Sequence, residues 1–213
     1  MSEIAKRLRQ CRKPSGEAGE QIAGEMNESH FELTGWGLEK ANIRKDGIIL
    51  DVGCGGGRTV NRLAAMACRG RIFGIDYSRD CVTWSERYNR ALIDEGRVRI
   101  LHGNVQEIPF DDSFFDTVTA VETIYFWADL LRCFEQVKRV LKQSGEFIII
   151  NEAYESERFS ERNRVYLESG DMKIPSPEQL RELLCRAGFD RVNAYVKEEK
   201  NWLCCIAQKQ ERS

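Results

Sequence analysis

Residues 48–60 decide the fold, and they read Ile48-Ile49-Leu50-Asp51-Val52-Gly53-Cys54-Gly55-Gly56-Gly57-Arg58-Thr59-Val60. The run begins with apolar, largely β-branched residues, a pattern typical of a buried parallel strand. Four glycines within five positions follow, and the next residues have a helical pattern. Strand, glycine turn and helix in this order begin a nucleotide-binding α/β unit. The glycines permit a sharp turn and let a ligand lie against bare backbone.

The spacing of the glycines narrows the choice of ligand. Gly53-x-Gly55-x-Gly57 is not the dinucleotide fingerprint G-x-G-x-x-G, because Arg58 stands where the third glycine should be. With the acid Asp51 before it, the stretch closely resembles the first motif of class I S-adenosylmethionine-dependent methyltransferases, (I/L)-x-D-x-G-C-G-x-G. The resemblance implies that Asp51 orders the turn and the amino group of the methionine moiety. It also implies that the cofactor lies against Gly53, Cys54, Gly55 and Gly57.

The second predicted strand, residues 71–76, ends in Asp76, 25 residues after Asp51. An acid at this place can accept hydrogen bonds from both ribose hydroxyls, in NAD enzymes as well as in methyltransferases. The alternative is a helix-capping role in the turn Asp76-Tyr77-Ser78. Tyr77 and Ser78 are predicted to lie beside the adenosine.

The stretch after the third predicted strand reads Gly103-Asn104-Val105-Gln106-Glu107-Ile108-Pro109-Phe110. It resembles the family's G-(D/N)-(A/V)-x-x-L-P-F, which pairs with the adenine ring. The resemblance implies that the Asn104 side chain binds the adenine amino group and that the Val105 amide binds a ring nitrogen, with Gly103 beside them. Asn in place of the commoner Asp keeps an acceptor oxygen without the charge.

The fourth predicted strand, residues 114–121, resembles the family's F-D-x-V-x-x, and the resemblance implies that Val121, at its end, lies beside the cofactor. Glu122-Thr123-Ile124-Tyr125-Phe126-Trp127 follows. It lacks the (N/D/S)-P-P-(Y/F) motif of DNA- and glutamine-directed methyltransferases, which counts against a nucleic-acid substrate. Glu122, Tyr125 and Trp127 are the leading candidates on the substrate side. The alternative is a solvated acid and two packing aromatics.

Residues 1–41 are predicted to form an N-terminal tail and cap helices, and residues 42–213 the methyltransferase domain. His30 and Trp36 lie in the cap segment and are candidates for lining the site, although Trp36 could simply pack the helices onto the sheet. Glu152, at the end of the fifth predicted strand, is a further pocket candidate, since the carboxyl ends of such strands form the functional edge. Residues 153–175 are expected to be irregular.

The remaining elements complete the fold class. Residues 80–95 are predicted as one helix with Trp84 and Tyr88 in the core. Ser176 is expected to cap a helix that begins at Pro177. Residues 191–197 and 202–208 are expected to form a hairpin. The prediction is an α/β, three-layer Rossmann-like class I methyltransferase fold with a mostly parallel seven-stranded sheet and a C-terminal antiparallel hairpin.

Composition excludes several classes of function. The chain has 213 residues and a net charge of −2, which does not favour a general polyanion binder. Eight cysteines without a C-x-x-C pair, together with two histidines, predict no metal site and a reduced, cytoplasmic protein. No signal peptide is expected, and the longest apolar run, residues 147–150, is too short to span a membrane.

The sequence therefore predicts a methyltransferase that uses S-adenosylmethionine, similar to the type 11 group with its ubiquinone- and menaquinone-pathway enzymes. The acceptor is expected to be a small molecule, because the chain has no separate recognition domain. Glu122 and His30 are candidates for a general base, and Tyr125 or Trp36 for an aromatic face that favours the cation. The alternatives are a non-catalytic binder of S-adenosylmethionine or S-adenosylhomocysteine, and a NAD-dependent oxidoreductase.

Overall fold

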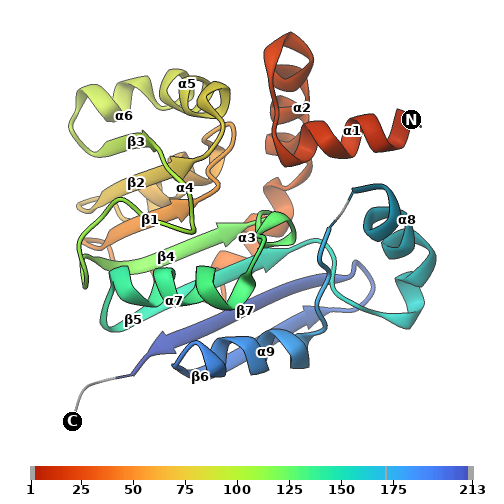
Figure 1. The fold of residues 1–213 in the computed structure, drawn as a ribbon. Helices are drawn as coiled ribbons and strands as arrows, with labels where there is room; N and C mark the ends of the chain where they lie inside the picture. Colours follow the sequence, from red (N-terminus) through yellow and green to blue (C-terminus); the bar gives the residue numbers. More distant parts are fainter. Residues whose placement is uncertain (1–2, 171, 211–213) are drawn as a thin grey trace.

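A computed structural model describes residues 3–170 and 172–210 and shows one sheet with helices on both faces (Figure 1). The strands are β1 Ile48–Val52, β2 Arg71–Asp76, β3 Val98–His102, β4 Phe115–Val121, β5 Leu141–Asn151, β6 Phe189–Lys197 and β7 Trp202–Lys209. The α-helices are α1 Glu3–Arg12, α2 Gly16–Ser29, α3 Phe31–Leu38, α4 Arg58–Met66, α5 Arg79–Tyr88, α6 Arg90–Asp94, α7 Leu130–Val140, α8 Ser160–Gly170 and α9 Pro177–Arg186. Two short 3₁₀ helices are η1 Ile124–Phe126 and η2 Glu157–Phe159.

The sheet confirms the predicted fold class. Its seven strands lie in the order β3-β2-β1-β4-β5-β7-β6. The neighbours from β3 to β5 pair in parallel, whereas β7 pairs antiparallel with both β5 and β6. All residues of β1 after Ile48 are buried, because helices cover both faces of this central strand. The last two strands form the predicted C-terminal hairpin.

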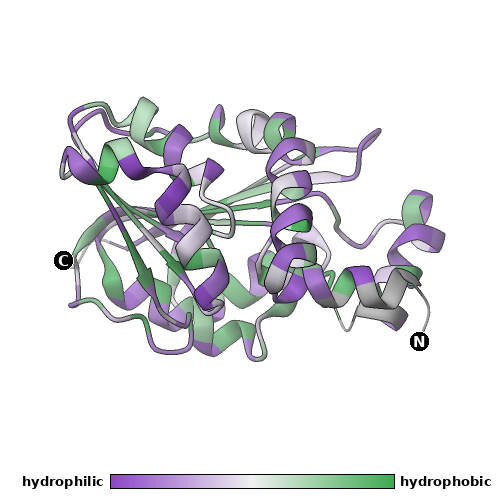
Figure 2. Cartoon of the chain, turned by 90° about the horizontal axis from the view of Figure 1, so that it is seen from above, coloured by the Kyte–Doolittle hydropathy of each residue, from purple (hydrophilic) through white to green (hydrophobic). Residues whose placement is uncertain are grey.

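Two hydrophobic clusters make the three layers. One packs α3 and α4 onto one face of the sheet, through residues such as Leu38 and Leu63 against Ile49. The other packs α7 and α9 onto the opposite face, through residues such as Phe134 and Leu184 against Phe147. In Figure 2 hydrophobic colour follows the central strands, while hydrophilic residues recur along the N-terminal helices.

The N-terminal segment lies beyond the carboxyl ends of the parallel strands, on the side where α8 also lies (Figure 1). The predicted N-terminal tail and cap segment contains α1, and α1 contacts α8. Hydrogen bonds tie the end of α1 and the residues after it to the rest of the fold: Tyr77 Oη donates to the Arg12 carbonyl at 2.5 Å, Ser78 Oγ donates to the Pro14 carbonyl, and Gly16 N donates to Asp80.

The prediction of one helix over residues 80–95 is wrong at its centre. Asn89 separates α5 from α6, and its side-chain amide donates to the Gly57 carbonyl at 2.9 Å. This contact ties the helix break to the turn after β1. Trp84 is only partly buried and Tyr88 is 49% exposed, so neither is a core residue.

Of two further predictions for the C-terminal part of the chain, one differs from the structure and one is confirmed. The segment 153–175, predicted to be irregular, contains η2 and α8. The predicted helix start at Ser176 is confirmed as a full capping box, in which Ser176 Oγ accepts from the Gln179 amide and the Gln179 side chain accepts from the Ser176 amide. In the part of the chain that the structure describes, no helix has both the length and the apolar character needed to cross a bilayer.

The turn after β1 gives a test of the packing. Gly57 has φ +84°, and a Cβ there would lie 2.5 Å from Ser85 Oγ and 2.6 Å from Asn89 Nδ2. Gly57→Ala is therefore expected to lower the free energy of unfolding by more than about 2 kcal/mol, through left-handed strain and overlap. Chemical denaturation measures the change. Gly24→Ala is the matched control: Gly24 lies inside α2 in open space, and alanine should stabilise by about 0.5–1 kcal/mol. Equal stability of the Gly57→Ala variant and the parent protein would contradict the packing described here.

Candidate functional site

A cavity of about 310 Å³ opens at the carboxyl ends of the parallel strands. Asp76 and Asn104 line one part of it, residues 53–56 of the glycine turn line another, and Glu122 and His30 line a third. The N-terminal segment closes over it with Cys11, Met26 and Phe31 among others. Ligand sites of α/β sheets occur at this edge, so one cavity joins most of the predicted positions.

The glycine turn is built from left-handed backbone conformations. Gly53, Gly55 and Gly57 have φ of 75°, 50° and 84°, which glycine adopts without the penalty of a side chain. The amides of Gly53 and Cys54 both donate to the Ile75 carbonyl, at 2.8 and 3.1 Å. These bonds hold the turn against the end of β2, so that Gly53, Cys54 and Gly55 line the cavity.

Asp51 lies behind the turn and does not line the cavity. Its carboxylate is 2% exposed and accepts a 2.6 Å hydrogen bond from Thr119 Oγ1. Burial is the main cause that raises the pKa of Asp51 to about 7; the hydrogen bond from Thr119 opposes the shift and the charge of Asp76 adds to it. Among the described residues its carboxylate makes no hydrogen bond to the glycine turn. Its direct ordering of that turn, expected from the resemblance, is therefore not seen.

Asp76 orders the turn instead. One carboxylate oxygen accepts from the Gly55 amide at 2.9 Å and the other from the Ser78 amide at 2.8 Å. Burial raises the pKa of Asp76, and these two backbone bonds oppose that shift. The helix cap of α5 is Ser78, whose hydroxyl accepts from the Cys81 amide, and not Asp76. Asp76 and Tyr77 line the cavity, whereas Ser78 is buried beneath the N-terminal segment.

Gly103, Asn104 and Val105 line the cavity next to Asp76, as predicted from the motif that contains them. The Asn104 side-chain oxygen accepts from the Gln106 amide at 3.0 Å, and its side chain is exposed toward the cavity. The Val105 amide donates to no acceptor among the described residues, although the residue is 8% exposed. A backbone donor is therefore available at this place.

Glu122 follows the last residue of β4 and has a left-handed conformation, with φ 58°, which is uncommon for a residue with a long side chain. Its side chain is 11% exposed, and its Oε2 lies 3.7 Å from Nε2 of His30. Burial raises the pKa of Glu122 well above its ordinary value, and the charge of Glu152 raises it further. Burial lowers the pKa of His30, which favours the neutral imidazole.

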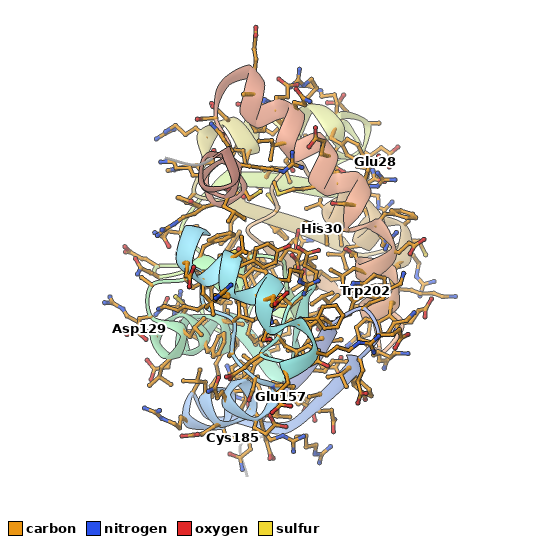
Figure 3. The ribbon with its side chains drawn as sticks, turned by 90° about the vertical axis from the view of Figure 1, so that its right-hand side faces the viewer. Glu28, His30, Asp129, Glu157, Cys185 and Trp202 are labelled. Carbon is orange, nitrogen blue, oxygen red and sulfur yellow. The ribbon has the colours of Figure 1, made fainter. Side chains whose placement is uncertain are left out.

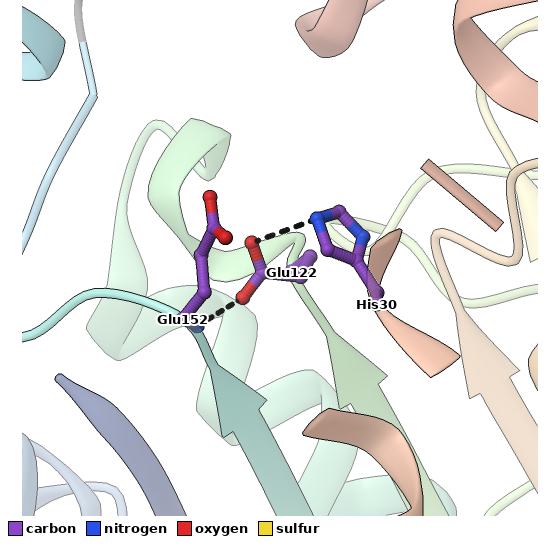
Figure 4. A group of neighbouring side chains, drawn as sticks. All are labelled: His30, Glu122 and Glu152. Carbon is purple, nitrogen blue, oxygen red and sulfur yellow. Dashed lines mark hydrogen bonds and ion pairs between the residues drawn. The ribbon is translucent and has the colours of Figure 1, made fainter. Parts of the chain in front are cut away.

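His30 and Glu152 reach this place from distant parts of the chain. His30 stands at the junction of α2 and α3, where it is both the C-cap of the first helix and the N-cap of the second. Figure 3 shows it between the N-terminal helices and α8. Glu152 follows the last residue of β5, and its backbone amide donates to Glu122 Oε1. Figure 4 shows the three side chains converging.

Tyr125 supports Glu122 from behind rather than facing the cavity. It is 1% exposed, its hydroxyl donates to Glu122 Oε1 at 3.0 Å, and the same hydroxyl accepts from the Ala153 amide at 2.9 Å. The expectation that its aromatic face meets a cation is therefore wrong, because the ring is enclosed by Phe126 and its neighbours. Its contact with Glu122 makes it a positioning residue.

The two tryptophans predicted to line the site, Trp127 and Trp36, lie in different places. Trp127 lines the cavity while its ring packs on Phe134 and Phe147, and its Nε1 donates to Thr123 Oγ1 at 3.3 Å. Trp36 does not reach the cavity. Its ring centroid lies 5.9 Å from that of Trp202, because α3 turns this face toward the C-terminal hairpin. The geometry therefore favours the alternative that Trp36 packs the N-terminal helices onto the sheet.

The cavity thus brings together most of the predicted site. The predicted residues that line it are His30, Gly53, Cys54, Gly55, Asp76, Tyr77, Gly103, Asn104, Val105, Val121, Glu122 and Trp127. Those that do not line it are Trp36, Asp51, Gly57, Ser78, Tyr125 and Glu152. Of the second group, Tyr125 and Glu152 still contact Glu122, and Asp51 and Gly57 lie next to lining residues.

Several lining residues were not predicted. Asn27 of α2 lies against Gly56, where a Cβ would come within 2.5 Å of its amide nitrogen. Phe31 lies beneath two guanidinium groups, with the Arg58 and Arg62 carbons 4.4 and 3.9 Å from its ring centroid. No local motif marks these positions. For Phe31, Arg58 and Arg62, only the aromatic or basic residue type could have indicated a place in the cavity wall.

Comparison with known proteins agrees with this site. Residues 50–149 match the family described as "Methyltransferase domain". Demethylmenaquinone methyltransferase of Oceanobacillus iheyensis is 23% identical over 178 residues, which cover 73% of this chain and 74% of that protein. The enzyme of the same name from Bacillus subtilis is 31% identical over 129 residues, which cover 59% of this chain and 54% of that protein.

A solved structure extends the likeness over the whole fold. It is a chain of the complex between the Haloferax volcanii Trm112 methyltransferase activator and a methyltransferase, with a TM-score of 0.78, 20% identity and 99% coverage of both chains. At this identity the likeness shows the fold alone. The family match adds the cofactor, S-adenosylmethionine, and the reaction, methyl transfer, and this sets aside the binder and oxidoreductase alternatives. The chain is thus similar to class I S-adenosylmethionine-dependent methyltransferases, with the family match covering residues 50–149.

Proposed function

We propose that this enzyme methylates a small molecule that binds in the cavity against Glu122 and His30. The observation that carries the proposal is the continuity of the cavity. A single hollow runs from the residues predicted to hold the nucleoside, past the glycine turn, to the polar end with Glu122 and His30. A donor at one end and an acceptor at the other can therefore meet within it.

The residues of the nucleoside end fit the proposed binding of S-adenosylmethionine. Gly55 has open space where a Cβ would stand, so a ligand can lie on its backbone. Asp76 keeps acceptor lone pairs beyond its two backbone bonds, which suits ribose hydroxyls. Asn104 and the unpaired Val105 amide offer an acceptor and a donor to the adenine edge. When bound, the cofactor supplies a methyl group already activated on a sulfonium.

The chain's contribution to the reaction is then mainly the placement of two reactants. Holding reactants in line is worth up to about 7–11 kcal/mol of the barrier. Glu122 and His30 are proposed to contact the acceptor and, where it must lose a proton, to take part in its removal. Tyr125 acts through Glu122, because its hydroxyl fixes one carboxylate oxygen.

Residues 1–41 are proposed to act as the cap of the site. Cys11, Met26 and Phe31 line the cavity from this segment, and hydrogen bonds from Tyr77, Ser78 and Gly16 hold the chain around Pro14 in place. A cavity closed by its own chain favours a small acceptor over a protein or nucleic acid. The net charge of −2 points the same way.

The proposal is tested with S-adenosylmethionine carrying a tritiated methyl group and a cell extract separated into low-mass, protein and nucleic-acid fractions. Label is expected in the low-mass fraction only. Glu122→Gln should abolish the labelling while the variant still binds S-adenosylhomocysteine, since Glu122 lies at the acceptor end. Label in protein or nucleic acid would refute a small-molecule acceptor.

Asp76→Asn tests the nucleoside end. An amide group would place N–H donors against the Gly55 or Ser78 amide and lose the charge that accepts from the ribose. Affinity for S-adenosylhomocysteine, measured by calorimetry, is expected to fall at least about tenfold, the cost of one charge-assisted hydrogen bond. Asp94→Asn, at an exposed carboxylate on α6 paired with Arg90, is the control and should bind as the parent does. Unchanged affinity of the Asp76→Asn variant would exclude the proposed ribose contact.

Asp51→Asn tests the cost of the buried acid. In the unfolded chain Asp51 ionises near its ordinary pKa of about 3.9, and in the fold its pKa is about 7. The folded protein therefore holds the proton longer, and the free energy of unfolding falls as pH rises from about 4 to about 7. Near pH 8 the asparagine variant should be more stable by on the order of 2–4 kcal/mol, and the gain should shrink toward pH 4.

Denaturation curves over this pH range measure the effect of Asp51→Asn. Asp111→Asn, at an exposed position, should follow the parent at every pH. A gain in stability that does not change with pH would show that the Asp51 carboxyl is not the titrating group.

A further inference from the structure

Three side chains at the acceptor end of the cavity form what we call the His-Glu-Glu cluster: His30, Glu122 and Glu152. They come from the junction of α2 and α3, the end of β4 and the end of β5 (Figure 4). Each offers one nitrogen or oxygen atom, and the three atoms lie within 4.8 Å of one another. Donor atoms this close can reach a common ion with small side-chain rotations.

The cluster is held in place by surrounding hydrogen bonds. Glu122 Oε1 accepts from the Tyr125 hydroxyl at 3.0 Å and from the backbone amide of Glu152. The Tyr125 hydroxyl is itself fixed by the Ala153 amide. Only Oε2 of Glu122 remains, and it faces His30 Nε2 at 3.7 Å. Bonds of this kind orient the carboxylates that bind metal ions.

The charges of the cluster call for a cation. Two carboxylates lie side by side, and no lysine or arginine among the described residues comes within ion-pair distance of either. Arg162 donates to the backbone carbonyl of Glu152 and not to its carboxylate. Buried carboxylates are normally paired or bound to metal.

We propose that His30, Glu122 and Glu152 bind a divalent first-row transition-metal ion, of the Mn²⁺, Fe²⁺, Co²⁺ or Zn²⁺ class. One imidazole with two carboxylates suits these ions, whereas Mg²⁺ and Ca²⁺ prefer oxygen ligands alone. Three protein ligands leave coordination positions toward the cavity, where an oxygen or nitrogen of the acceptor can bind and lose its proton more readily. With an ion bound, Glu122 is a ligand and not a general base.

This inference deepens the proposed function but does not rest on it, because metal binding is measured without methyl transfer. The probe is Co²⁺ added to the full chain after treatment with a chelator, followed by absorption spectroscopy, with Mn²⁺ and Zn²⁺ titrated by calorimetry. One Co²⁺ per chain is expected, with visible bands of nitrogen and oxygen ligation and no sulfur-to-cobalt charge transfer. A sulfur-to-cobalt charge-transfer band would instead indicate that Cys11, which lines the same cavity, is a ligand.

Variants assign the site. His30→Ala and Glu122→Gln should each weaken Co²⁺ binding far more than about tenfold, and Tyr125→Phe by about tenfold, since it removes only an orienting bond. Glu157→Gln, at an exposed carboxylate in η2 (Figure 3), and Cys11→Ser should bind Co²⁺ as the parent does. Calorimetry with S-adenosylhomocysteine on every variant shows that its fold and its cofactor site are intact.

Absence of saturable Co²⁺, Mn²⁺ and Zn²⁺ binding, or binding that survives both His30→Ala and Glu122→Gln, would overturn the metal site. The first result would leave the cluster to face a cationic group of the acceptor instead. Metal binding without any transfer of label would refute the small-molecule methylation and leave the metal site standing. Methyl transfer and S-adenosylhomocysteine binding by a protein that binds none of these metal ions would refute the metal site and leave the small-molecule methylation standing.

Discussion

The close packing of neighbouring segments against bare backbone at the glycine turn is the constraint on which the rest of the site depends. A Cβ at Gly53 would overlap Thr123 at the end of β4, one at Gly56 would meet Asn27 of α2, and one at Gly57 would meet Ser85 and Asn89 at the end of α5. Three segments far apart in sequence thus take the space that side chains would need. The absence of those side chains places the acceptor loop, the cap and the helix break around one point.

Asp76 connects this turn to the N-terminal segment. Its carboxylate accepts from Gly55 on one side and from Ser78 on the other, and Ser78 in turn donates to the Pro14 carbonyl. The nucleoside end of the cavity is therefore a short chain of hydrogen bonds from β1 to the cap. A change at Asp76 therefore acts on ligand contacts and on cap position together.

The acceptor end is organised differently, around buried charge. The left-handed backbone of Glu122 turns its side chain away from the strand direction, and Tyr125 and the Glu152 amide fix one of its oxygens. Such strain and such burial of an acid cost stability and are typical of functional sites. Asp51, before the glycine turn, is likewise a buried acid, and its pKa is raised to about 7 mainly by burial. Burial thus favours the protonated form of both acids.

The sequence determined the parts of this protein that depend on local pattern. The apolar run and glycines of residues 48–57 predicted the first strand and turn, Ser176 with Gln179 predicted a capping box, and the motif around Asn104 predicted a cavity wall. Each of these signals lies within a few residues, because backbone conformation and capping are local properties. Trp36, Trp84 and Tyr88 show the limit: an aromatic at helical spacing is apolar, but its neighbours are set by other elements. The tertiary structure alone decided which faces were buried, and it alone joined His30, Glu122 and Glu152. Their separation along the chain gives no motif, and only the parallel sheet brings the ends of β4 and β5 beneath the junction of α2 and α3.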